Sequence, residues 1–331
     1  MSTTKGNVPP MADLSIDNIT ANTILINSQN PDERLTYVFE RLVTHLHDFA
    51  RETRLSTREW SAGLNFLVEV GKISSDVRKE FILLSDILGL SLLVDALDHP
   101  KPDKSTEGSV LGPFHTHDAV VHPSGESISA DPNGEPLLVC CTARDREGNP
   151  VEGVKVDVWE TDSSGHYDVQ YQERSNPDGR AVLLTDADGT FWFKAIRPVS
   201  YPIPHDGPVG KLLELLHRHP WRPAHMHFMF EKQGWDHLIT ALYIPPDQYL
   251  SSDAVFGVKT SLVTPLGKVT AEQARKYNVP EGTALLTYDF VLVTEQETEA
   301  LRDKNALEAV SKLFPGRKCK LVDHLPVPDL D

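Results

Sequence analysis

The sequence predicts a mainly β fold, in which an antiparallel β-sandwich follows an α-helical N-terminal region. In residues 31–98, apolar side chains recur at the spacing of one helix face. From Leu137 onward the apolar period becomes two, which is typical of strands, and turn clusters such as Asn176-Pro177-Asp178-Gly179 separate the runs. Strands that follow one another without intervening helices favour a sandwich over an alternating βαβ fold.

These patterns divide the 331 residues into three parts. Residues 1–30 are polar, contain Pro9-Pro10, and are expected to form a flexible leader. Residues 31–105 hold the helices and a linker, because Pro, Gly, His and Ser become frequent from Pro100 to Gly134. Residues 106–331 are expected to form the β-sandwich domain.

Four helices are expected in the first region. From Pro31 to about Thr53 a single stripe joins Leu35, Val38, Phe39, Leu42, Val43 and Leu46. The capping-box pattern Ser56-Thr57-Arg58-Glu59 begins a second helix. Ser74 or Ser75 is expected to cap a third helix that ends at Gly89, and a short fourth covers Leu92–Leu97.

Period-two runs in the second region predict strands at Leu137–Ala143, Val154–Trp159, Thr190–Ile196, His225–Phe230, Ile239–Ile244 and Ala284–Val293. A short helix is expected at Gly210–His219. Residues 297–313 are expected to form a helix or a loop excursion, and a polar tail follows them.

Composition excludes several classes of function. A formal net charge of −16 argues against nucleic-acid binding, because phosphate contacts require clustered Lys and Arg. No apolar run reaches about 18 residues, so no membrane span is expected. The N-terminus has no signal-peptide core. Cys140, Cys141 and Cys319 do not make a disulfide framework or a zinc site, and two neighbouring thiols in an apolar strand favour a reducing compartment, the cytoplasm.

A candidate metal site begins in the stretch from Trp221 to Phe228, which is expected to be a short strand. Side chains alternate along a strand, so His225 and His227 point the same way and could bind one metal ion, although such a pair is as often structural. Tyr167 and Tyr201 are candidate oxygen ligands at neighbouring turns. A phenolate ligates only a strongly Lewis-acidic ion, so two phenolates and two imidazoles favour Fe(III) over Zn(II) or Fe(II).

Five motifs in series carry a family resemblance, and the match as a whole covers roughly residues 31–295, in order. They are Val110-Leu111-Gly112-Pro113-Phe114, Asp157-Val158-Trp159-Glu160-Thr161-Asp162 through Tyr167, Tyr201-Pro202-Ile203-Pro204-His205-Asp206-Gly207-Pro208, Arg222-Pro223-Ala224-His225-Met226-His227, and Ser252-Asp253-Ala254-Val255-Phe256-Gly257. With them the chain resembles the intradiol ring-cleavage dioxygenases, closest to the catechol and hydroxyquinol 1,2-dioxygenase branch.

The resemblance implies one non-haem Fe(III) per subunit, held by Tyr167, Tyr201, His225 and His227 with a hydroxide in a fifth position. It implies no nicotinamide, flavin or haem. It also implies a homodimer built by the N-terminal helices, with a phospholipid in a tunnel between them. The stripe between residues 35 and 46 suits that dimer, although ordinary packing within one subunit would explain it equally.

The resemblance further implies roles in the reaction. A diol would displace the hydroxide and Tyr201, which then take the two substrate protons, and Arg222 would stabilise negative charge that develops on the ring. Both atoms of O2 would enter the product. The implied substrate pocket comprises Leu83, Asp86, Val110, Leu111, Gly112, Pro113, Phe114, Ile203, Pro204, Arg222 and Val255.

Two departures from the catechol enzymes concern the substrate. Leu83 and Asp86 share a helix face, and Asp86 stands where catechol-specific relatives carry an apolar residue or proline. Ala241 replaces their usual Gln. These residues favour hydroxyquinol (benzene-1,2,4-triol), cleaved to 3-hydroxy-cis,cis-muconate and hence maleylacetate. Local pairing of Asp86 is the alternative role for that residue, and a catechol or substituted-catechol 1,2-dioxygenase is the alternative enzyme. A non-catalytic β-sandwich ligand-binding module is the alternative from another class.

Overall fold

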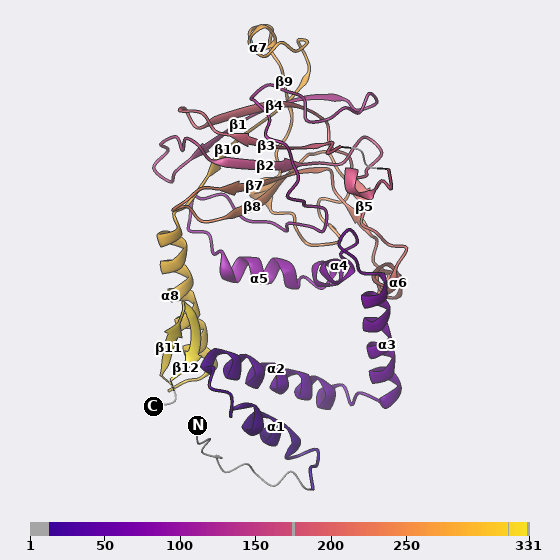
Figure 1. Cartoon of the computed structure of the whole chain (residues 1–331), viewed down its shortest axis with the longest axis vertical. Coiled ribbons are helices and arrows are strands. Elements are labelled where there is room, and N and C mark those ends of the chain that lie inside the picture. Colours follow the sequence, from indigo (N-terminus) through magenta and orange to yellow (C-terminus); the bar gives the residue numbers. More distant parts are fainter. Residues whose placement is uncertain (1–12, 174–175, 317, 330–331) are drawn as a thin grey trace. The chain divides into compact units, whose positions relative to one another are not determined.

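The structure, a computed structural model, describes residues 13–173, 176–316 and 318–329 (Figure 1). The chain forms two compact units. Unit 1 takes its described residues from Met1–Leu67 and Arg302–Asp331, and unit 2 takes its own from Val68–Leu301. The expected division near residue 105 remains a prediction.

Unit 1 begins with one helix that was not expected from the sequence and two that were. They are α1 (Ile19–Asn27), α2 (Glu33–Glu52) and most of α3 (Thr57–Ile73). The capping box at the start of α3 is confirmed, because Ser56 N donates to Glu59 Oε2 at 2.9 Å and Glu59 N donates to Ser56 Oγ at 3.2 Å. The end of α8 (Glu295–Leu313) and the hairpin of β11 (Cys319–Val322) and β12 (Leu325–Pro328) complete the unit.

Helix α1 lies in the segment that was expected to be a flexible leader. Its Thr20 Oγ1 is 2.9 Å from His47 Nδ1 of α2, and Arg51 donates to Ile16 O at 2.8 Å. These contacts hold α1 against α2. Residues 1–12 of the expected leader lie outside the described residues.

Unit 2 carries the remaining helices and strands. They are α4 (Glu80–Ile87), α5 (Leu90–Asp98), β1 (Pro136–Arg144), β2 (Lys155–Trp159), the 3₁₀ helix η1 (Asp168–Gln170), β3 (Arg180–Leu184), β4 (Thr190–Ile196), β5 (Tyr201–Pro202), α6 (Pro208–Leu215), β6 (Trp221–Arg222), β7 (His225–Glu231), β8 (Leu238–Tyr243), the 3₁₀ helix η2 (Thr260–Leu262), β9 (Gly267–Lys268), α7 (Ala271–Tyr277) and β10 (Ala284–Val291).

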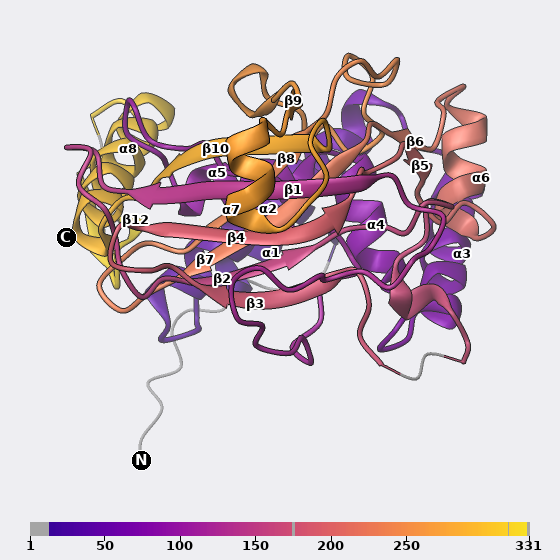
Figure 2. The same ribbon diagram turned by 90° about the horizontal axis from the view of Figure 1, so that it is seen from above.

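Within the described residues, two larger sheets have the strand orders β4-β1-β10-β9 and β3-β2-β7-β8; they stack in layers in Figure 1 and are seen from above in Figure 2. Their inner faces bury an aromatic cluster of Phe191, Phe228, Phe230 and Phe290. The predicted β-sandwich is confirmed. One pairing was not expected, because β1 and β10 run parallel while the other pairs of these sheets are antiparallel.

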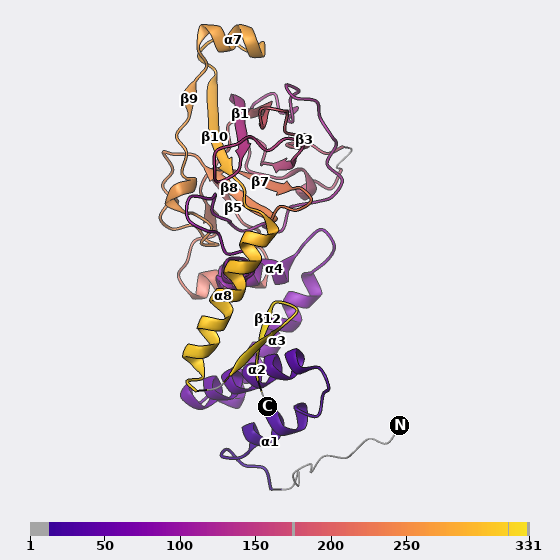
Figure 3. The same ribbon diagram turned by 90° about the vertical axis from the view of Figure 1, so that its left-hand side faces the viewer.

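Helices α4 and α5 lie on the outer side of the β3-β2-β7-β8 sheet (Figures 1 and 3). Since strand side chains alternate, β7 turns Met226, Phe228 and Phe230 toward the other sheet, and it turns its two histidines toward the helices. The space between this sheet and α4 therefore holds the candidate site.

Two local predictions were wrong. The third helix begins at Glu80, because Ser75 Oγ accepts from Arg78 N at 3.0 Å and closes a turn instead of capping the helix. The stretch from Trp221 to Phe228 is not one strand. Pro223 has no N–H for a ladder, so β6 ends at Arg222 and β7 begins at His225.

Candidate metal centre

Strand β7 brings two imidazoles together. His225 and His227 are both buried, and their Nε2 atoms lie 3.0 Å apart, so the prediction that they share a face is confirmed. Cross-strand partners enclose them, because His225 pairs with Tyr243 and His227 pairs with Ala241 on one side and with Trp159 on the other. Ala241 is fully buried.

Two tyrosines meet the imidazoles. The Tyr167 and Tyr201 hydroxyl oxygens lie 3.3 Å apart, and both side chains are buried. The Tyr201 ring lies 5.5 Å from that of His225, and the Tyr167 ring lies 6.5 Å from that of His227. The structure therefore brings together all four residues that the sequence proposes as metal ligands.

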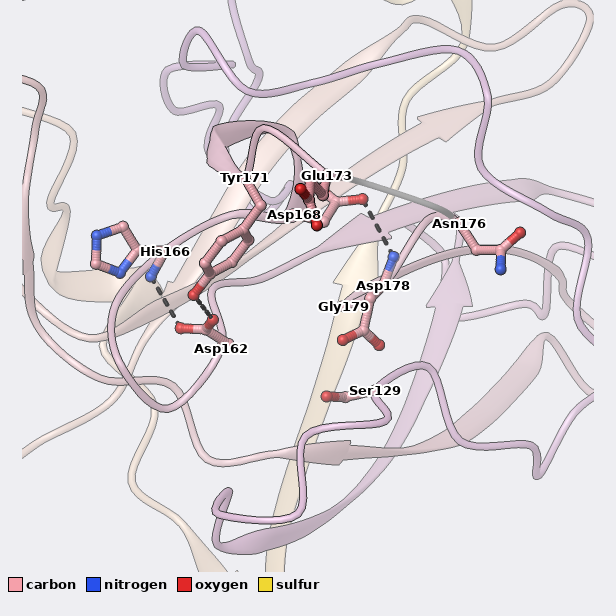
Figure 4. A pocket seen from close by; sticks show the side chains of 9 residues that line it. All are labelled: Ser129, Asp162, His166, Asp168, Tyr171, Glu173, Asn176, Asp178 and Gly179. Carbon is pink, nitrogen blue, oxygen red and sulfur yellow. Dashed lines mark hydrogen bonds between the residues drawn. The ribbon is translucent and has the colours of Figure 1, made fainter.

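The loop that carries Tyr167 is fixed at both ends (Figure 4). Asp162 accepts from the backbone N–H groups of Ser164 at 2.9 Å and His166 at 3.0 Å, and it binds the Tyr171 hydroxyl, so it stabilises the turn that precedes Tyr167. On the other side of Tyr167, Asp168 accepts from Asp178 N at 3.1 Å. The carboxylates in this pocket thus hold the loop, and Tyr167 enters the site from a rigid backbone.

The other tyrosine is fixed by the short pair β5–β6. Tyr201 stands directly opposite Arg222 in that pair. The carboxylate of Asp247 accepts from Ser200 Oγ at 2.5 Å and from Ala224 N at 2.7 Å. One carboxylate therefore connects the residue before Tyr201 with the residue before His225, and this connection was not predicted.

The electrostatics of the four groups suit a cation. Burial, followed by the charge of Arg222, lowers the pKa of His225 to about 3, and burial also lowers the pKa of His227 well below its usual value. Both imidazoles are thus neutral donors. His225 Nδ1 lies 2.7 Å from Pro223 O, a geometry that makes Nδ1 the protonated atom and leaves the Nε2 lone pair for the site.

Burial and the neighbouring Tyr201 raise the pKa of Tyr167 well above its usual value. This phenol keeps its proton unless a strong Lewis acid displaces it. Two neutral imidazoles and two clustered phenols in a buried site therefore fit a ferric ion.

Arg222 lies beside these groups and is held from several sides. Its Nε donates to Asp253 Oδ1 at 3.0 Å, its Nη2 donates to the Tyr243 hydroxyl at 3.3 Å, and its Nη1 lies 3.0 Å from His225 Nε2. Although burial opposes the charged form, the charge of Asp253 raises the pKa of Arg222 well above its usual value. Arg222 thus places a fixed positive charge next to the first residue of β7.

The residues predicted to bind a substrate surround the same place. One apolar cluster contains both tyrosines together with Leu83, Val110, Leu111, Phe114, Ile203 and Val255. Gly112 has a φ of 75°, in the left-handed region that favours glycine, and a Cβ there would make only an ordinary contact with His227 Nε2 at 3.9 Å. Pro113 and Pro204 line an adjoining cavity of about 460 Å³ with Leu83, Phe114 and Ile203.

Asp86 is the polar member of this surface. It is buried on α4, and Arg222 and Asp253 are among the charges that act on it. Burial raises the pKa of Asp86 above its usual value, while a hydrogen bond with Ser91 and the charge of Arg222 oppose that shift. Among the described residues, no group hydrogen-bonds Asp86 Oδ2.

Sequence reasoning missed several residues that support the site. Trp159 stacks on His227, with ring centroids 4.8 Å apart. Buried Arg180 binds both oxygens of Asp168 through Nε at 3.0 Å, and it donates to Phe114 O at 3.2 Å. The sequence gives little indication of these two roles. A Trp or an Arg at either position could equally belong to ordinary packing.

From their places in a Pro- and Gly-rich connection, His115, His117 and His122 are expected to be exposed, and for His115 this expectation is wrong. Its side chain is only 6% exposed, and its Nε2 lies 3.1 Å from Asp157 Oδ2. In the part of the chain that the structure describes, no group of three or more His, Cys, Asp or Glu side chains is arranged to hold a metal ion. The tyrosine-containing site remains the candidate metal centre.

Comparisons with known proteins follow this geometry. The chain matches the family described as "Dioxygenase" over residues 111–294 and the one described as "Catechol dioxygenase N terminus" over residues 32–106. It belongs to the intradiol ring-cleavage dioxygenases. Enzymes of this family generally depend on non-haem iron. Among the described residues, no helix is both long enough and apolar enough to cross a bilayer.

Individual relatives cover nearly all of this dioxygenase. It is 68% identical to the intradiol ring-cleavage dioxygenase hqdA of Aspergillus niger, over the full length of both chains. It is 44% identical to a 6-chlorohydroxyquinol 1,2-dioxygenase of Cupriavidus pinatubonensis, over 83% of this chain and 96% of the relative. The crystal structure of a hydroxyquinol 1,2-dioxygenase from Pseudomonas putida matches with a TM-score of 0.78 and 38% identity, over 85% of this chain and 99% of that one.

Proposed function

We propose that this dioxygenase opens hydroxyquinol between its two adjacent hydroxyl-bearing carbons, with O2, to give 3-hydroxy-cis,cis-muconate, the tautomer of maleylacetate. Relatives named for hydroxyquinol and 6-chlorohydroxyquinol support the substrate class. Both oxygen atoms of O2 enter the product, and no nicotinamide, flavin or haem takes part.

The observation that carries the choice of substrate is the unsatisfied oxygen of Asp86. A buried carboxyl oxygen without a donor is costly, and a ligand hydroxyl in the pocket would remove that cost. Catechol has no third hydroxyl to offer. A site built for such a hydrogen bond discriminates strongly against the analogue that lacks it.

An oxygen-uptake panel tests this choice. We expect a higher kcat/KM for hydroxyquinol than for catechol, pyrogallol, protocatechuate or 4-chlorocatechol, and a catechol value above the hydroxyquinol value would reject the proposal. Asp86→Ala should lower kcat/KM for hydroxyquinol by about 5- to 100-fold, the cost of one unpaired buried polar group, and affect catechol far less. Equal losses on both substrates would remove the role given to Asp86. Asp103→Ala, at an exposed carboxylate, is the matched control.

We further propose that Tyr167, Tyr201, His225 and His227 hold one Fe(III) per subunit. The donor set supports this, because the two imidazoles are neutral and the phenols are buried where only a Lewis acid would displace their protons. Purified protein should contain about one iron per chain and absorb visible light through its tyrosinates. Tyr167→Phe or Tyr201→Phe should shift or abolish that absorption, whereas Tyr37→Phe should not. A colourless protein without iron would refute the assignment.

The side chains take distinct parts in this reaction. A ferric ion held by Tyr167, Tyr201, His225 and His227 would supply Lewis-acid and redox chemistry toward the diol. Tyr201 accepts a proton from one substrate hydroxyl, since its oxygen lies at the junction of β5–β6 and the ligand cluster. Arg222 stabilises negative charge on the ring from a position fixed by Asp253. The apolar residues around them hold the ring and exclude water.

We also propose a homodimer formed through the N-terminal helices of residues 31–105. On α2, Leu42, Leu46 and Phe49 are 47%, 56% and 52% exposed, so packing within the chain does not bury this part of the stripe. A Leu42→Glu/Leu46→Glu variant should be monomeric by light scattering. A dimeric variant would contradict this interface.

A bound phospholipid is proposed for the same region. A cavity of about 420 Å³ in unit 1 combines apolar Ile16, Ile19 and Leu55 with Arg51 and Arg54, which suits an acyl chain and a phosphate. Lipid extraction and mass spectrometry of the purified dimer test this.

For the compartment we propose the cytoplasm, since Cys140, Cys141 and Cys319 are all free thiols.

A further inference from the structure

Arg218 lies just after α6 and joins two segments that contribute to the apolar cluster of the proposed substrate pocket. Its Nη1 donates to Ile87 O at 2.6 Å, and its Nη2 donates to Ala254 O at 2.8 Å. Ile87 is the residue after Asp86 and the last of α4. Ala254 stands between Asp253, which holds Arg222, and Val255 of the pocket.

The end of α4 needs such a donor. The last carbonyl groups of a helix have no partner within the helix and carry partial negative charge, which favours a cation there. A guanidinium presents parallel N–H groups in a rigid fork, so it can bind two carbonyl oxygens at a fixed separation. A lysine ammonium in the same place has no such fork.

The surrounding backbone keeps Arg218 in this position. His217 has a φ of 53°, in the left-handed region, and its N–H and that of Arg218 close the end of α6 on Glu214 O and Leu213 O. Phe256, also left-handed at φ 62°, covers the guanidinium at 4.8 Å from the ring centroid. Two non-glycine residues in this rarely occupied region therefore flank one arginine.

Helix α6 also holds the opposite end of α4. Val209 N, in its first turn, donates to Glu80 Oε1 at 3.1 Å, and Glu80 begins α4. The helix that carries Leu83 and Asp86 is thus tied to α6 at its first residue and through Arg218 at its last. Of these two contacts, the one made by Arg218 also reaches Ala254, next to the Asp253 that orients Arg222.

We propose that Arg218 is a positioning residue for substrate selection, which sets the separation between Asp86 and Arg222 by clamping Ile87 O to Ala254 O. This rests on the proposed preference for hydroxyquinol. Asp86 binds the third hydroxyl of the substrate, while Arg222 faces the carbons that react. A change in the separation between Asp86 and Arg222 therefore weakens the binding of hydroxyquinol selectively. A catechol ring has no group for Asp86 and is less sensitive to that separation.

The test compares variants of the iron-loaded enzyme on hydroxyquinol and catechol. Arg218→Met should lower kcat/KM for hydroxyquinol by roughly 10-fold or more, chiefly through KM, and change that for catechol by less than about 3-fold. The kcat/KM of Arg218→Lys for hydroxyquinol should lie between those of the parent enzyme and Arg218→Met, because lysine keeps the charge but lacks the forked pair of N–H groups. Iron content and the visible absorption should match the parent enzyme. Arg197→Met, which removes an exposed ion pair with Glu135, is the matched control.

A double-variant cycle separates positioning from general support. In the Asp86→Ala background, Arg218→Met should no longer change the ratio of the two kcat/KM values, since both act on the same hydrogen bond. A loss shared equally by both substrates, or a ratio change that persists without Asp86, would overturn the proposal. If Arg218→Met does not fold, Phe256→Leu should shift the ratio in the same direction, and an unchanged ratio would count against the clamp.

Failure of the proposed function gives a different result. A parent enzyme that prefers catechol would refute the hydroxyquinol assignment whatever Arg218 does. A parent that prefers hydroxyquinol, with a ratio that no Arg218 variant changes, would refute only the positioning role.

Discussion

The indole of Trp159 lies against the imidazole of His227 with ring planes only 5° from parallel. Among the described residues, His227 Nδ1 has no hydrogen-bond partner, so stacking takes the orienting part that a hydrogen bond usually plays for a metal-binding histidine. Trp159 also meets His115 edge-on, and His115 Nε2 lies 3.1 Å from Asp157 Oδ2.

We expect Trp159→Leu to weaken iron binding by about 10- to 100-fold, the usual cost of losing such a support. Trp159→Phe should retain much of the affinity because a ring can still stack. Competition with an iron chelator measures both. Trp192→Leu, on β4, removes an indole away from the site and should leave iron affinity unchanged. Equal weakening by the Trp159 and Trp192 variants would contradict the role of stacking.

Arg180 and Asp168 form a buried ion pair beside Tyr167. Arg180→Met should lower the free energy of unfolding by about 3–5 kcal/mol, because it leaves a buried carboxylate without its partner. Asp168→Asn in that background should recover part of the loss by removing the uncompensated charge. Urea denaturation measures both steps. No recovery in the double variant would show that lost packing, and not the charge, is the cause.

Gly257 makes room for the groups that hold Arg222. A Cβ at this position would lie 2.6 Å from the Tyr243 hydroxyl oxygen and 2.9 Å from Arg222 Nη2. Gly257→Ala should therefore displace the guanidinium and lower kcat by about 10²-fold, while the protein still folds and binds iron. At Gly267 a Cβ meets only ordinary contacts, so Gly267→Ala should retain full activity. A fully active Gly257→Ala enzyme would show that Arg222 tolerates the shift.

The buried carboxyl of Glu160, which is not a proposed metal ligand, makes the free energy of unfolding depend on pH. Burial raises the pKa of Glu160 well above its usual value of 4.5, although a bond from Ile196 N opposes the shift. The folded state therefore keeps a proton that the unfolded state releases, so this group's contribution to stability is complete below pH 4.5 and is lost as pH rises toward the raised pKa.

Glu160→Gln stays neutral and can still accept from Ile196 N. Its stability relative to the parent should therefore increase between pH 5 and pH 8, as followed by urea denaturation across that range. Glu152→Gln, at an exposed position, should show a constant difference. A constant difference for Glu160→Gln as well would mean that the buried carboxyl titrates normally.

Local patterns predicted much of this molecule. The period of two located β1, β2, β4, β7, β8 and β10, and the spacing of His225 and His227 predicted their common face. The place of the two tyrosines came from family motifs, and the structure brings their oxygens together. Such features depend on residues that are close in sequence or share a recognisable context.

Contacts between distant segments were not predictable in this way. The pairing of β1 with β10 joins residues more than 140 positions apart, and neither strand's own sequence indicates that the two run parallel. Arg218 is another case, since nothing in its own sequence indicates the carbonyl groups of Ile87 and Ala254. The hairpin β11–β12 contains two prolines, which obscured its strand pattern.

The place of β10 has a consequence for the order in which the protein matures. It is the last strand of the sandwich along the chain, yet it lies between β1 and β9, and its Phe290 packs on Phe228 and Phe230 at the back of β7. A nascent polypeptide that has not yet been synthesised through residue 291 lacks the support behind its two histidines. We therefore expect the proposed metal site to form only after the sandwich has been translated, because a prematurely terminated chain carries every proposed ligand without the packing behind β7.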